Sequence, residues 1–252
     1  MSNAGQVYLI PSILHEEGMD AIPSYIVSAV IKCNVFFSEN ERSARRFLKK
    51  LWKAYLPDQN IVIDDYEWYS VHKNEKEMLP VFRKKLMEGK TIGIISEAGC
   101  PGIADPGQLL VAAAHEYEAS VKPLVGPSSI LMALMASGLN GQQFCFSGYL
   151  PIDNIERIKA LRELETESVK KKSTQIFIET PYRNNQLLDA VLKTCKPSTQ
   201  LCIAANLTSQ NESVKTKTIG DWSKQKPDLH KQPVIFCLLA RAFMSQTDII
   251  NN

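Results

Sequence analysis

Residues 91–107 of the chain read TIGIISEAGCPGIADPG. The β-branched start of this stretch predicts a short buried strand over Thr91–Ser96. Three glycines and two prolines in the twelve residues Ser96–Gly107 then fix an unusual backbone path ahead of a helix. Ligands of α/β proteins bind at the carboxyl ends of strands, where a glycine-rich turn exposes main-chain donors and acceptors. The stretch therefore predicts a ligand-binding loop, although an ordinary tight loop ending in a helix cap explains it equally well.

The rest of the chain repeats this alternation of short apolar runs with longer segments of helical period. Such a pattern is typical of βαβ units around a mainly parallel sheet, so we predict an α/β fold. The polar segment from Asn206 to His230 fits either an antiparallel hairpin or a long loop. The predicted strands are Val7–Pro11, Val35–Ser38, Thr91–Ser96, Val121–Val125, Phe144–Gly148, Thr174–Glu179, Gln200–Ala205 and Val234–Leu239.

Four helices are predicted with particular clarity. Ser128–Ser137 is apolar on nearly every side, so we expect it to be buried, and Tyr182–Thr194 has the pattern of an ordinary surface helix. A change of composition near Pro151 precedes the highly charged helix Asp153–Lys172 and suggests a domain boundary in this part of the chain. The fourth helix, Glu41–Tyr55, has an apolar stripe opposite one wholly basic face. The cations of that face are Arg42, Arg45, Arg46, Lys49, Lys50 and Lys53.

Composition restricts the class of protein. The chain has 252 residues, 44% of them hydrophobic, and 29 Lys and Arg against 27 Asp and Glu, which is a globular composition with a net charge of only +2. Disorder, collagen and coiled coil are excluded. No global field attracts this protein to nucleic acid or to an anionic membrane, so any nucleic-acid contact must be a local patch.

The cysteines and the apolar runs indicate a cytoplasmic protein. The six cysteines are scattered and form none of the close pairs of zinc or redox motifs, so we expect free thiols in a reducing compartment. The first apolar run, Val7–Ile13, ends in His15, Glu16 and Glu17 and does not match a secretory signal. No run approaches the ~20 apolar residues of a membrane-spanning helix.

Several common chemistries lack their motifs in this sequence. The G-x-G-x-x-G fingerprint of dinucleotide binding is absent, and so is the Gly-Lys-Ser/Thr ending of a nucleoside triphosphate loop. No His-x-x-x-His helix or carboxylate cluster indicates a catalytic metal, so we predict none. None of the four histidines is adjacent to a nucleophile elbow.

A second informative segment, Val125–Ile130, again places a turn between a strand and a buried helix. Its sequence is Val-Gly-Pro-Ser-Ser-Ile. Ser128 or Ser129 is a natural N-cap residue, and that role alone accounts for the pair. Presentation of a hydroxyl group to a ligand is the alternative.

Taken in order, these segments resemble the tetrapyrrole methylase superfamily of S-adenosylmethionine-dependent methyltransferases. The likeness is greatest to the branch that methylates a ribose 2′-hydroxyl in small-subunit ribosomal RNA. It runs over almost the whole chain. The residues that carry it are Glu97–Pro101, Asp105–Gly107, Gly126–Ser129, Ser137–Leu139, Phe144, Gly148–Pro151 and, more weakly, Glu179–Arg183.

The resemblance implies two α/β domains with mainly parallel or mixed sheets, usually in a homodimer, with the S-adenosylmethionine cleft between the domains. We expect residues 5–125 to form the acceptor-side domain with the glycine-rich loop, and residues 126–252 to form the adenosine-side domain. Loop backbone groups hold the methyl donor in such proteins. The implied donor-binding residues are Gly99, Cys100, Ile103, Ala104, Ser128, Ser129, Thr180, Ala205, Asn206 and Pro233.

The chain departs from the branch in three segments. The usual Pro-Thr-Pro-Ile-Gly-Asn-Leu is here Pro-Ser-Ile-Leu-His-Glu-Glu over residues 11–17, and the usual Glu-Asp-Thr-Arg is Glu-Asn-Glu-Arg over residues 39–42. The customary Lys-Gly-Glu before the last strand is Lys-Gln-Pro over residues 231–233. Two of the three lie in the amino-terminal half, so we expect the donor site to match the family better than the acceptor site does.

The acceptor side offers only candidate residues. By resemblance, Glu39, Arg42, His72 and Glu75 are candidates for a general base or for another catalytic group, and solvated surface is an equal alternative for each. Arg42, Arg45, Arg46 and Lys49 of the basic helix face fit contacts to RNA phosphates, or else a solvated exterior. Methylation of a tetrapyrrole or another small molecule, and a donor-binding protein without catalysis, remain the alternatives to ribosomal RNA methylation.

Overall fold

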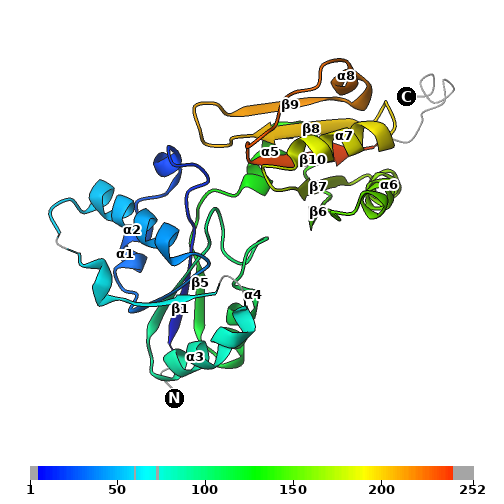
Figure 1. Cartoon of the computed structure of the whole chain (residues 1–252). Helices are drawn as coiled ribbons and strands as arrows, with labels where there is room; N and C mark the ends of the chain where they lie inside the picture. Colours follow the sequence, from blue (N-terminus) through cyan, green and yellow to red (C-terminus); the bar gives the residue numbers. More distant parts are fainter. Residues whose placement is uncertain (1–4, 60, 72–73, 241–252) are drawn as a thin grey trace. The chain divides into compact units, whose positions relative to one another are not determined.

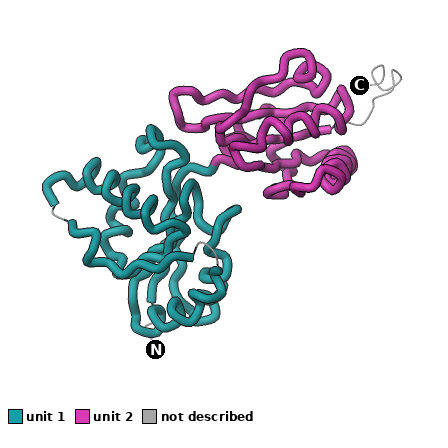
Figure 2. Tube along the Cα trace, in the orientation of Figure 1, with its two compact units in different colours: residues 1–128 teal, residues 129–252 magenta. Residues whose placement is uncertain are grey.

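The computed structural model describes residues 5–59, 61–71 and 74–240. The chain divides into two compact units, unit 1 (residues 1–128) and unit 2 (residues 129–252), as Figure 2 shows. Each unit contains one five-stranded sheet with helices packed on it (Figure 1). The predicted α/β class is therefore confirmed. The composition change near Pro151 lies inside unit 2, just before a charged helix.

The sheet of unit 1 is parallel throughout and has the order β3-β2-β4-β1-β5. Parallel neighbours need crossover connections, and helices supply most of them. Since all five strands point the same way, their carboxyl ends share one edge of the sheet. The strands are β1 (Gln6–Ile10), β2 (Val35–Ser38), β3 (Glu67–Ser70), β4 (Thr91–Ile95) and β5 (Ser120–Pro123).

Helices cover both faces of this sheet. The described residues of unit 1 form four α-helices and two short 3-10 helices. They are η1 (Gly18–Ala21), α1 (Ile26–Val30), α2 (Glu41–Tyr55), η2 (Ile63–Asp65), α3 (Glu75–Met87) and α4 (Gln108–Glu116). Helix α2 begins where the side chain of Asn40 accepts hydrogen bonds from two first-turn N–H groups.

The alternation of side chains along the strands produces two hydrophobic clusters in unit 1. Phe36 of β2 packs with α1 and α2 on one face, whereas Phe37 packs with α3 and α4 on the other. Both phenylalanines are fully buried. Burial on both faces explains why these strands are continuous apolar runs in the sequence.

The sheet of unit 2 is mixed and has the order β6-β7-β10-β8-β9. Only β6 and β7 are parallel, and the other neighbours are antiparallel. Its strands are β6 (Phe144–Tyr149), β7 (Thr174–Ile178), β8 (Gln200–Ala205), β9 (Ser213–Thr218) and β10 (Val234–Leu239), and its helices are α5 (Ser129–Ser137), α6 (Asn154–Lys171), α7 (Asn184–Thr194) and α8 (Ile219–Lys224).

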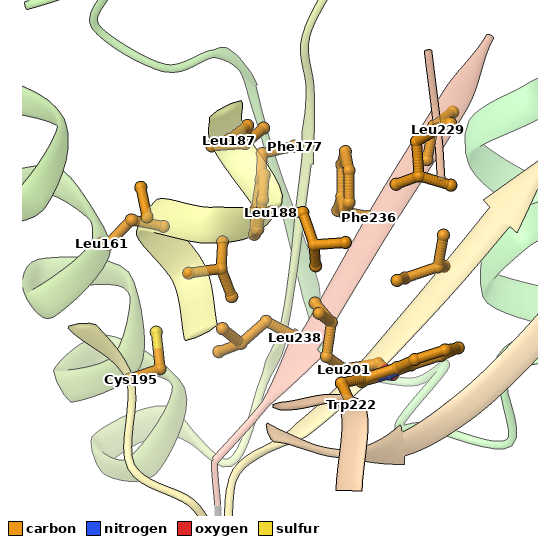
Figure 3. Packing of buried hydrophobic residues seen from close by; sticks show 14 of the residues in the cluster. Leu161, Phe177, Leu187, Leu188, Cys195, Leu201, Trp222, Leu229, Phe236 and Leu238 are labelled. Carbon is orange, nitrogen blue, oxygen red and sulfur yellow. The ribbon is translucent and has the colours of Figure 1, made fainter. Parts of the chain in front are cut away.

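The core of unit 2 joins three of its helices to the sheet. Leu161 of α6 and Leu188 of α7 pack in one cluster with Phe177 and Phe236 of the strands (Figure 3). Trp222 of α8 lies in the same cluster, and its indole N–H donates to the carbonyl of Leu201 at 2.8 Å. The buried polar edge of this large side chain is thus satisfied.

Most of the predicted elements coincide with the observed ones. All eight predicted strands are present within a residue or two, and α2 has the predicted bounds. Strand β3 and helix α3 were not predicted. The segment from Asn206 to His230 is a hairpin at its start, because β9 pairs antiparallel with β8, and it continues into α8.

Candidate functional site

The glycine-rich loop leaves the carboxyl end of β4, the central strand of the unit 1 sheet, and leads into α4. Gly107, the residue before α4, has a φ of +135°, and a Cβ there would lie 3.2 Å from the backbone nitrogen of Gly102. Only glycine takes this conformation without strain. Ala104 also lies in the left-handed region, with a φ of +65°. A strained non-glycine residue at a loop tip is typical of functional sites.

The loop is joined to the segment that follows β1. Ser12 donates its N–H to the Gly99 carbonyl at 2.8 Å and accepts the Gly99 N–H at 3.2 Å. The Cys100 thiol lies 3.6 Å from the carbonyl of Pro127. Residues of two other sequence segments therefore fix the first half of the loop.

Two of the predicted catalytic candidates contact this loop through its backbone. An oxygen of Glu39 accepts the N–H of Glu97 at 2.9 Å. Oε1 of Glu75 accepts the N–H groups of Gly107 at 3.1 Å and Leu110 at 3.0 Å. The structure thus brings Glu39 and Glu75 to opposite ends of one loop.

The other two candidates are placed differently. Arg42 is exposed on α2 and belongs to the basic face of that helix. His72 lies outside the described residues.

Asp105 is the acidic residue of the loop whose titration departs most from normal. Partial burial raises the pKa of its carboxyl group to about 7, and the negative charge of Glu39 adds to the rise, while a hydrogen bond with Ser96 opposes it. The charge of Glu97 contributes in the same direction as Glu39. Near neutral pH, the loop therefore contains a carboxyl group that is only partly ionised.

Some of the loop residues predicted to bind the methyl donor have backbone N–H groups that make no hydrogen bond among the described residues. Within the described part of the chain, the backbone N–H groups of Cys100 and Ala104 donate no hydrogen bond. The Ile103 side chain is 52% exposed, although it is apolar. Unpaired amides beside an exposed apolar side chain suit a ligand with both polar and apolar parts.

The Pro-Ser-Ser turn contains the boundary between the two units in the sequence. Ser128 is the last residue of unit 1, and Ser129 is the first residue of α5. Gly126, just before the turn, approaches Pro11 so closely that a Cβ on it would lie 2.2 Å from the Pro11 Cβ. This close approach explains the glycine.

Within unit 2, the remaining residues predicted to bind the methyl donor lie at one edge of the sheet. Thr180 follows β7, Ala205 ends β8, and Pro233 directly precedes β10. Because β10 is antiparallel to both β7 and β8, its start lies beside their carboxyl ends, with Val234 paired to Ala205. The structure thus brings together residues that are 53 positions apart in the sequence (180 to 233).

Gln232 fixes the turn that contains Asn206. The Asn206 amide donates to Oε1 of Gln232 at 2.8 Å, and the Asn206 backbone N–H donates to Pro233 O at 3.0 Å. The fully buried Asn184 donates its amide to the Gln232 carbonyl at 2.7 Å. These donors of Asn206 are used inside the protein, and its backbone carbonyl accepts the N–H of Ser209 at 3.0 Å, which leaves its side-chain oxygen as the group that could face a ligand.

Glu179 and Arg183 stabilise the same edge. The Glu179 side chain is almost fully buried and accepts bonds from the Arg183 guanidinium and the Thr180 N–H, both at 2.7 Å. Burial alone would raise the pKa of Glu179, but these two donors hold it below its ordinary value. The carboxylate therefore stays ionised and keeps the Thr180 backbone in place.

The basic face of α2 is divided between paired and unpaired cations. Arg45 bonds to Glu41 and Asp64, and its guanidinium lies 5.0 Å from the centre of the Trp68 ring. Arg46 has one weak partner, Glu16, at 3.5 Å. The other cations have no ion-pair partner in the described part of the chain. They are Arg42, Lys49, Lys50 and Lys53, and all six cations line one shallow depression.

Two structural features are absent from the described residues. They contain no helix with the length and apolar character needed to cross a membrane. They also contain no group of three or more His, Cys, Asp or Glu side chains arranged to hold a metal ion.

Residues 21–222 match the family described as tetrapyrrole (corrin/porphyrin) methylases. The chain belongs to this family. The prediction made from the glycine-rich loop and the Pro-Ser-Ser turn is therefore confirmed at family level. The matched region includes the whole loop, both carboxylates that bond to it, and the unit 2 edge as far as Asn206.

Curated relatives of this tetrapyrrole methylase carry the name ribosomal RNA small subunit methyltransferase I. The protein of Escherichia coli O157:H7 is 32% identical over 165 residues, which cover 64% of this chain and 56% of that protein. The protein of Buchnera aphidicola subsp. Schizaphis graminum is 27% identical over 243 residues, covering 95% and 79%. The protein of Vibrio cholerae is 34% identical over 148 residues, covering 59% and 50%. The chain thus spans little more than half the length of most of these relatives.

Solved structures of methyltransferases have the same fold. The methyltransferase CobJ aligns with a TM-score of 0.61 over 96% of this chain and 97% of its own, at 14% identity. The uroporphyrin-III-C-methyltransferase from Thermus thermophilus aligns with a TM-score of 0.53 over 93% and 94%, at 15% identity. Identities this low support the fold and not the substrate.

Sequence reasoning missed three residues of the site. Ser12 and Gln232 lie in segments that depart from the family pattern, so resemblance gave no reason to select them. Asp105 belongs to the matched segment, but its raised pKa depends first on burial and then on the charge of Glu39, which is 66 positions away (39 to 105). An acidic residue between Ala104 and Pro106 in a ligand-binding loop was the available signal for it.

Proposed function

We propose that this chain is an S-adenosylmethionine-dependent methyltransferase that methylates a ribose 2′-hydroxyl in small-subunit ribosomal RNA. The observation that carries the proposal is the glycine-rich loop at the carboxyl end of β4, with its unpaired amides, in a member of a methylase family. The acceptor follows from the curated relatives, whose common name specifies small-subunit ribosomal RNA.

The donor-binding groups are assigned separately in each unit. In unit 1 they are the backbones of Gly99, Cys100 and Ala104, the exposed side chain of Ile103, and Ser128. In unit 2 they are Ser129, Thr180, Ala205, Asn206 and Pro233. The loop fits this donor, because the unpaired N–H groups of Cys100 and Ala104 match its carboxylate and hydroxyl acceptors. Asp105 of the same loop is partly ionised near neutral pH, and its ionised form suits a cationic sulfonium.

The donor supplies a methyl group on a positively charged sulfur. In the transfer, the bond from methyl carbon to sulfur breaks, a bond from that carbon to the ribose oxygen forms, and the hydroxyl proton leaves to a base or to water. Such an in-line displacement needs alignment of oxygen, carbon and sulfur more than it needs a covalent intermediate. The contribution of the loop is therefore to hold its backbone groups in fixed positions.

The basic face of α2 is the proposed contact with RNA phosphates. Among its members, Arg42 and Lys49 have no ion-pair partner in the described part of the chain, whereas Arg45 is held by two carboxylates. Unpaired exposed cations release counterions from RNA without first breaking an ion pair. Arg42 and Lys49 therefore contribute more to RNA affinity than Arg45 and Arg46 do.

A cytoplasmic location and a homodimer belong to the same proposal. Small ribosomal subunits are the proposed partner, and a homodimer is the state that the family resemblance implies. Sedimentation velocity of the purified chain tests the dimer, and a monomer at micromolar concentration contradicts it.

The function is tested by binding and then by transfer. Isothermal titration with S-adenosylmethionine and S-adenosylhomocysteine measures the donor site. Tritiated donor is then mixed with small ribosomal subunits purified from cells that lack the modification, and the RNA is digested with alkali. A 2′-O-methyl group blocks alkaline cleavage at its own nucleotide, so the expected label is in an alkali-resistant dinucleotide.

Each of the other possible outcomes would indicate a different function. Label in alkali-sensitive mononucleotides would place the methyl group on a base. Binding without any labelled RNA would favour a tetrapyrrole or other small acceptor, or a donor-binding protein without catalysis. Absence of donor binding would contradict the proposal as a whole.

A further inference from the structure

We infer that Glu39 and Glu75 are positioning residues that hold the two ends of the glycine-rich loop, and thereby fix the backbone groups that bind the donor. The inference rests on the proposed function of this loop. It changes the role considered for both residues, from general base or other catalytic group to support of the loop.

Glu75 provides the cap that α4 cannot provide for itself. The first N–H groups of a helix have no partners inside the helix, and a side chain at the N-cap position usually accepts one of them. The N-cap residue of α4 is Gly107, which has no side chain. Helix α3 lies beside α4 (Figure 1), and Oε1 of Glu75 at its start accepts the N–H groups of Gly107 and Leu110.

The charge of Glu75 adds to the effect of its hydrogen bonds. The amino end of a helix carries a partial positive charge, and a carboxylate near it is stabilised. Hydrogen bonds between charged and neutral groups are also stronger than those between neutral groups. The end of the loop is therefore fixed by a residue from a separate helix.

Glu39 holds the start of the loop in the corresponding way. It directly follows β2, which is paired with β4, and its backbone N–H donates to the Ile95 carbonyl at 3.1 Å. Its side chain then accepts the N–H of Glu97 at 2.9 Å, one residue into the loop. Two bonds from one residue thus extend the β2–β4 pairing past the end of the sheet.

Between these two supports, the loop has few attachments. Ser12 bonds to Gly99, and the remaining backbone bonds near the tip, such as Gly102 to Pro106, are internal to the loop. The amides of Cys100 and Ala104 lie in this span. Since a displacement of about 1 Å can cost a hundredfold in rate, release of either end should impair both donor binding and alignment.

The decisive experiment compares four variants by hydrogen exchange, donor binding and transfer. Glu75→Ala and Glu39→Ala remove one support each, and Glu75→Gln keeps an acceptor oxygen without the charge. Glu77→Ala is the matched control, because Glu77 is on the same helix and makes no contact with the loop among the described residues. The measurements are amide exchange of peptides covering residues 97–110, the Kd for S-adenosylhomocysteine, and kcat and the two KM values for transfer.

We expect amide exchange at residues 107–110 in Glu75→Ala, and around residue 97 in Glu39→Ala, to be at least about tenfold faster than in the wild type. The Kd for S-adenosylhomocysteine should rise about tenfold in both, while the KM for ribosomal subunits changes less than about twofold. Glu75→Gln should recover much of the donor affinity, and Glu77→Ala should match the wild type. A general base would instead lose kcat with unchanged donor affinity, and Glu75→Gln would not recover it.

Three results would overturn the inference. Unchanged exchange in both alanine variants would mean that the carboxylates do not hold the loop. Faster exchange with an unchanged Kd would mean that the loop ends do not position the donor. If the wild type itself does not bind S-adenosylhomocysteine, the proposed function fails and this inference fails with it. Should an alanine variant not fold, Glu75→Gln and an equivalent Glu39→Gln provide the same comparison.

Discussion

Replacement of Asp105 by Asn should stabilise unit 1 above neutral pH. The carboxyl group of Asp105 has a pKa of about 7 instead of the usual 3.8, first because of burial and then because of the nearby charge of Glu39. Between these two values, the native protein holds a proton that the unfolded chain has released. Stability therefore falls as the pH rises from 3.8 to 7, and the loss is complete above pH 7. Asparagine has a similar shape and carries no charge, so it removes this pH-dependent loss.

The size of the effect follows from the shift. About three pKa units correspond to about 4 kcal/mol at pH 8, since one unit is about 1.4 kcal/mol. Asp105 is only partly buried, so solvent screening reduces this to about 2 kcal/mol. At pH 5, only the part of the penalty between pH 3.8 and pH 5 is present, or about 1 kcal/mol after the same reduction. The advantage of the variant over the wild type should therefore grow by about 1 kcal/mol from pH 5 to pH 8.

Urea unfolding monitored by tryptophan fluorescence measures this difference. Two of the three tryptophans, Trp52 and Trp68, lie in unit 1 and the third, Trp222, lies in unit 2, so the difference between wild type and variant reports on unit 1. Asp20→Asn is the control, because Asp20 is an exposed carboxylate of the same unit without a partner among the described residues. An Asp105→Asn advantage that is equal at pH 5 and pH 8, or a loss of stability at pH 8, would refute the electrostatic reasoning.

Three further variants test other parts of the site. Arg42→Glu combined with Lys49→Glu should weaken RNA binding and reduce the slope of log K against log salt by about 1.4, or about 0.7 for each lost phosphate contact. Gly126→Ala should destabilise unit 1 by about 2 kcal/mol, since its Cβ would lie 2.2 Å from an atom of Pro11. Gln232→Ala removes the acceptor of the Asn206 amide and should raise the Kd for S-adenosylhomocysteine by about three- to tenfold.

Each of these predictions has a matched control. Lys32→Glu with Lys84→Glu makes the same charge change at exposed lysines of unit 1 outside the basic face, and an equal salt slope in both double variants would contradict the RNA contact. Gly141→Ala adds a methyl group where nothing lies within 4 Å, so a Gly126→Ala protein as stable as this control contradicts the steric argument. Gln232→Glu keeps the acceptor oxygen for Asn206 but loses the Nε2 donor to the Asp228 carbonyl, so it should recover only part of the donor affinity.

Sequence patterns predicted the elements that are stabilised by residues close together in the chain. Helix α2 has an apolar stripe, a basic face and an Asn40 cap within 16 residues (40 to 55), and its bounds were predicted correctly. The buried strands were equally clear, because a strand covered on both faces must be apolar throughout. Strand β3 was missed, since Glu67–Ser70 (EWYS) lies at the sheet edge and is stabilised by the Trp68 and Tyr69 rings stacking on β2. That stacking depends on residues more than 30 positions away.

Contacts between residues far apart in the sequence could not be predicted for the site either. The glycine-rich loop could be found because its backbone path requires glycines and prolines in one continuous stretch. The roles of Glu39 and Glu75 could not be found, because each carboxylate meets its N–H partners only after the β2–β4 pairing and the α3–α4 packing have formed. Resemblance selected both residues, but it gave no indication that their partners are backbone groups of the loop.

Residues 11–17 depart from the family pattern, which is the main argument for a donor-binding protein without catalysis. The contacts of this segment weaken that argument. Ser12 bonds to Gly99 through its backbone in both directions, so this support of the loop does not depend on which side chain is present. Pro11, which the family pattern shares, packs against Gly126 before the Pro-Ser-Ser turn. The changed residues begin at Ser12 itself, and the side chain of Leu14 lies against the loop, 3.3 Å from where a Cβ of Gly99 would be. The departure from the family therefore keeps the backbone bonds that hold Gly99, and its consequences should appear in the choice of acceptor before they appear in donor binding.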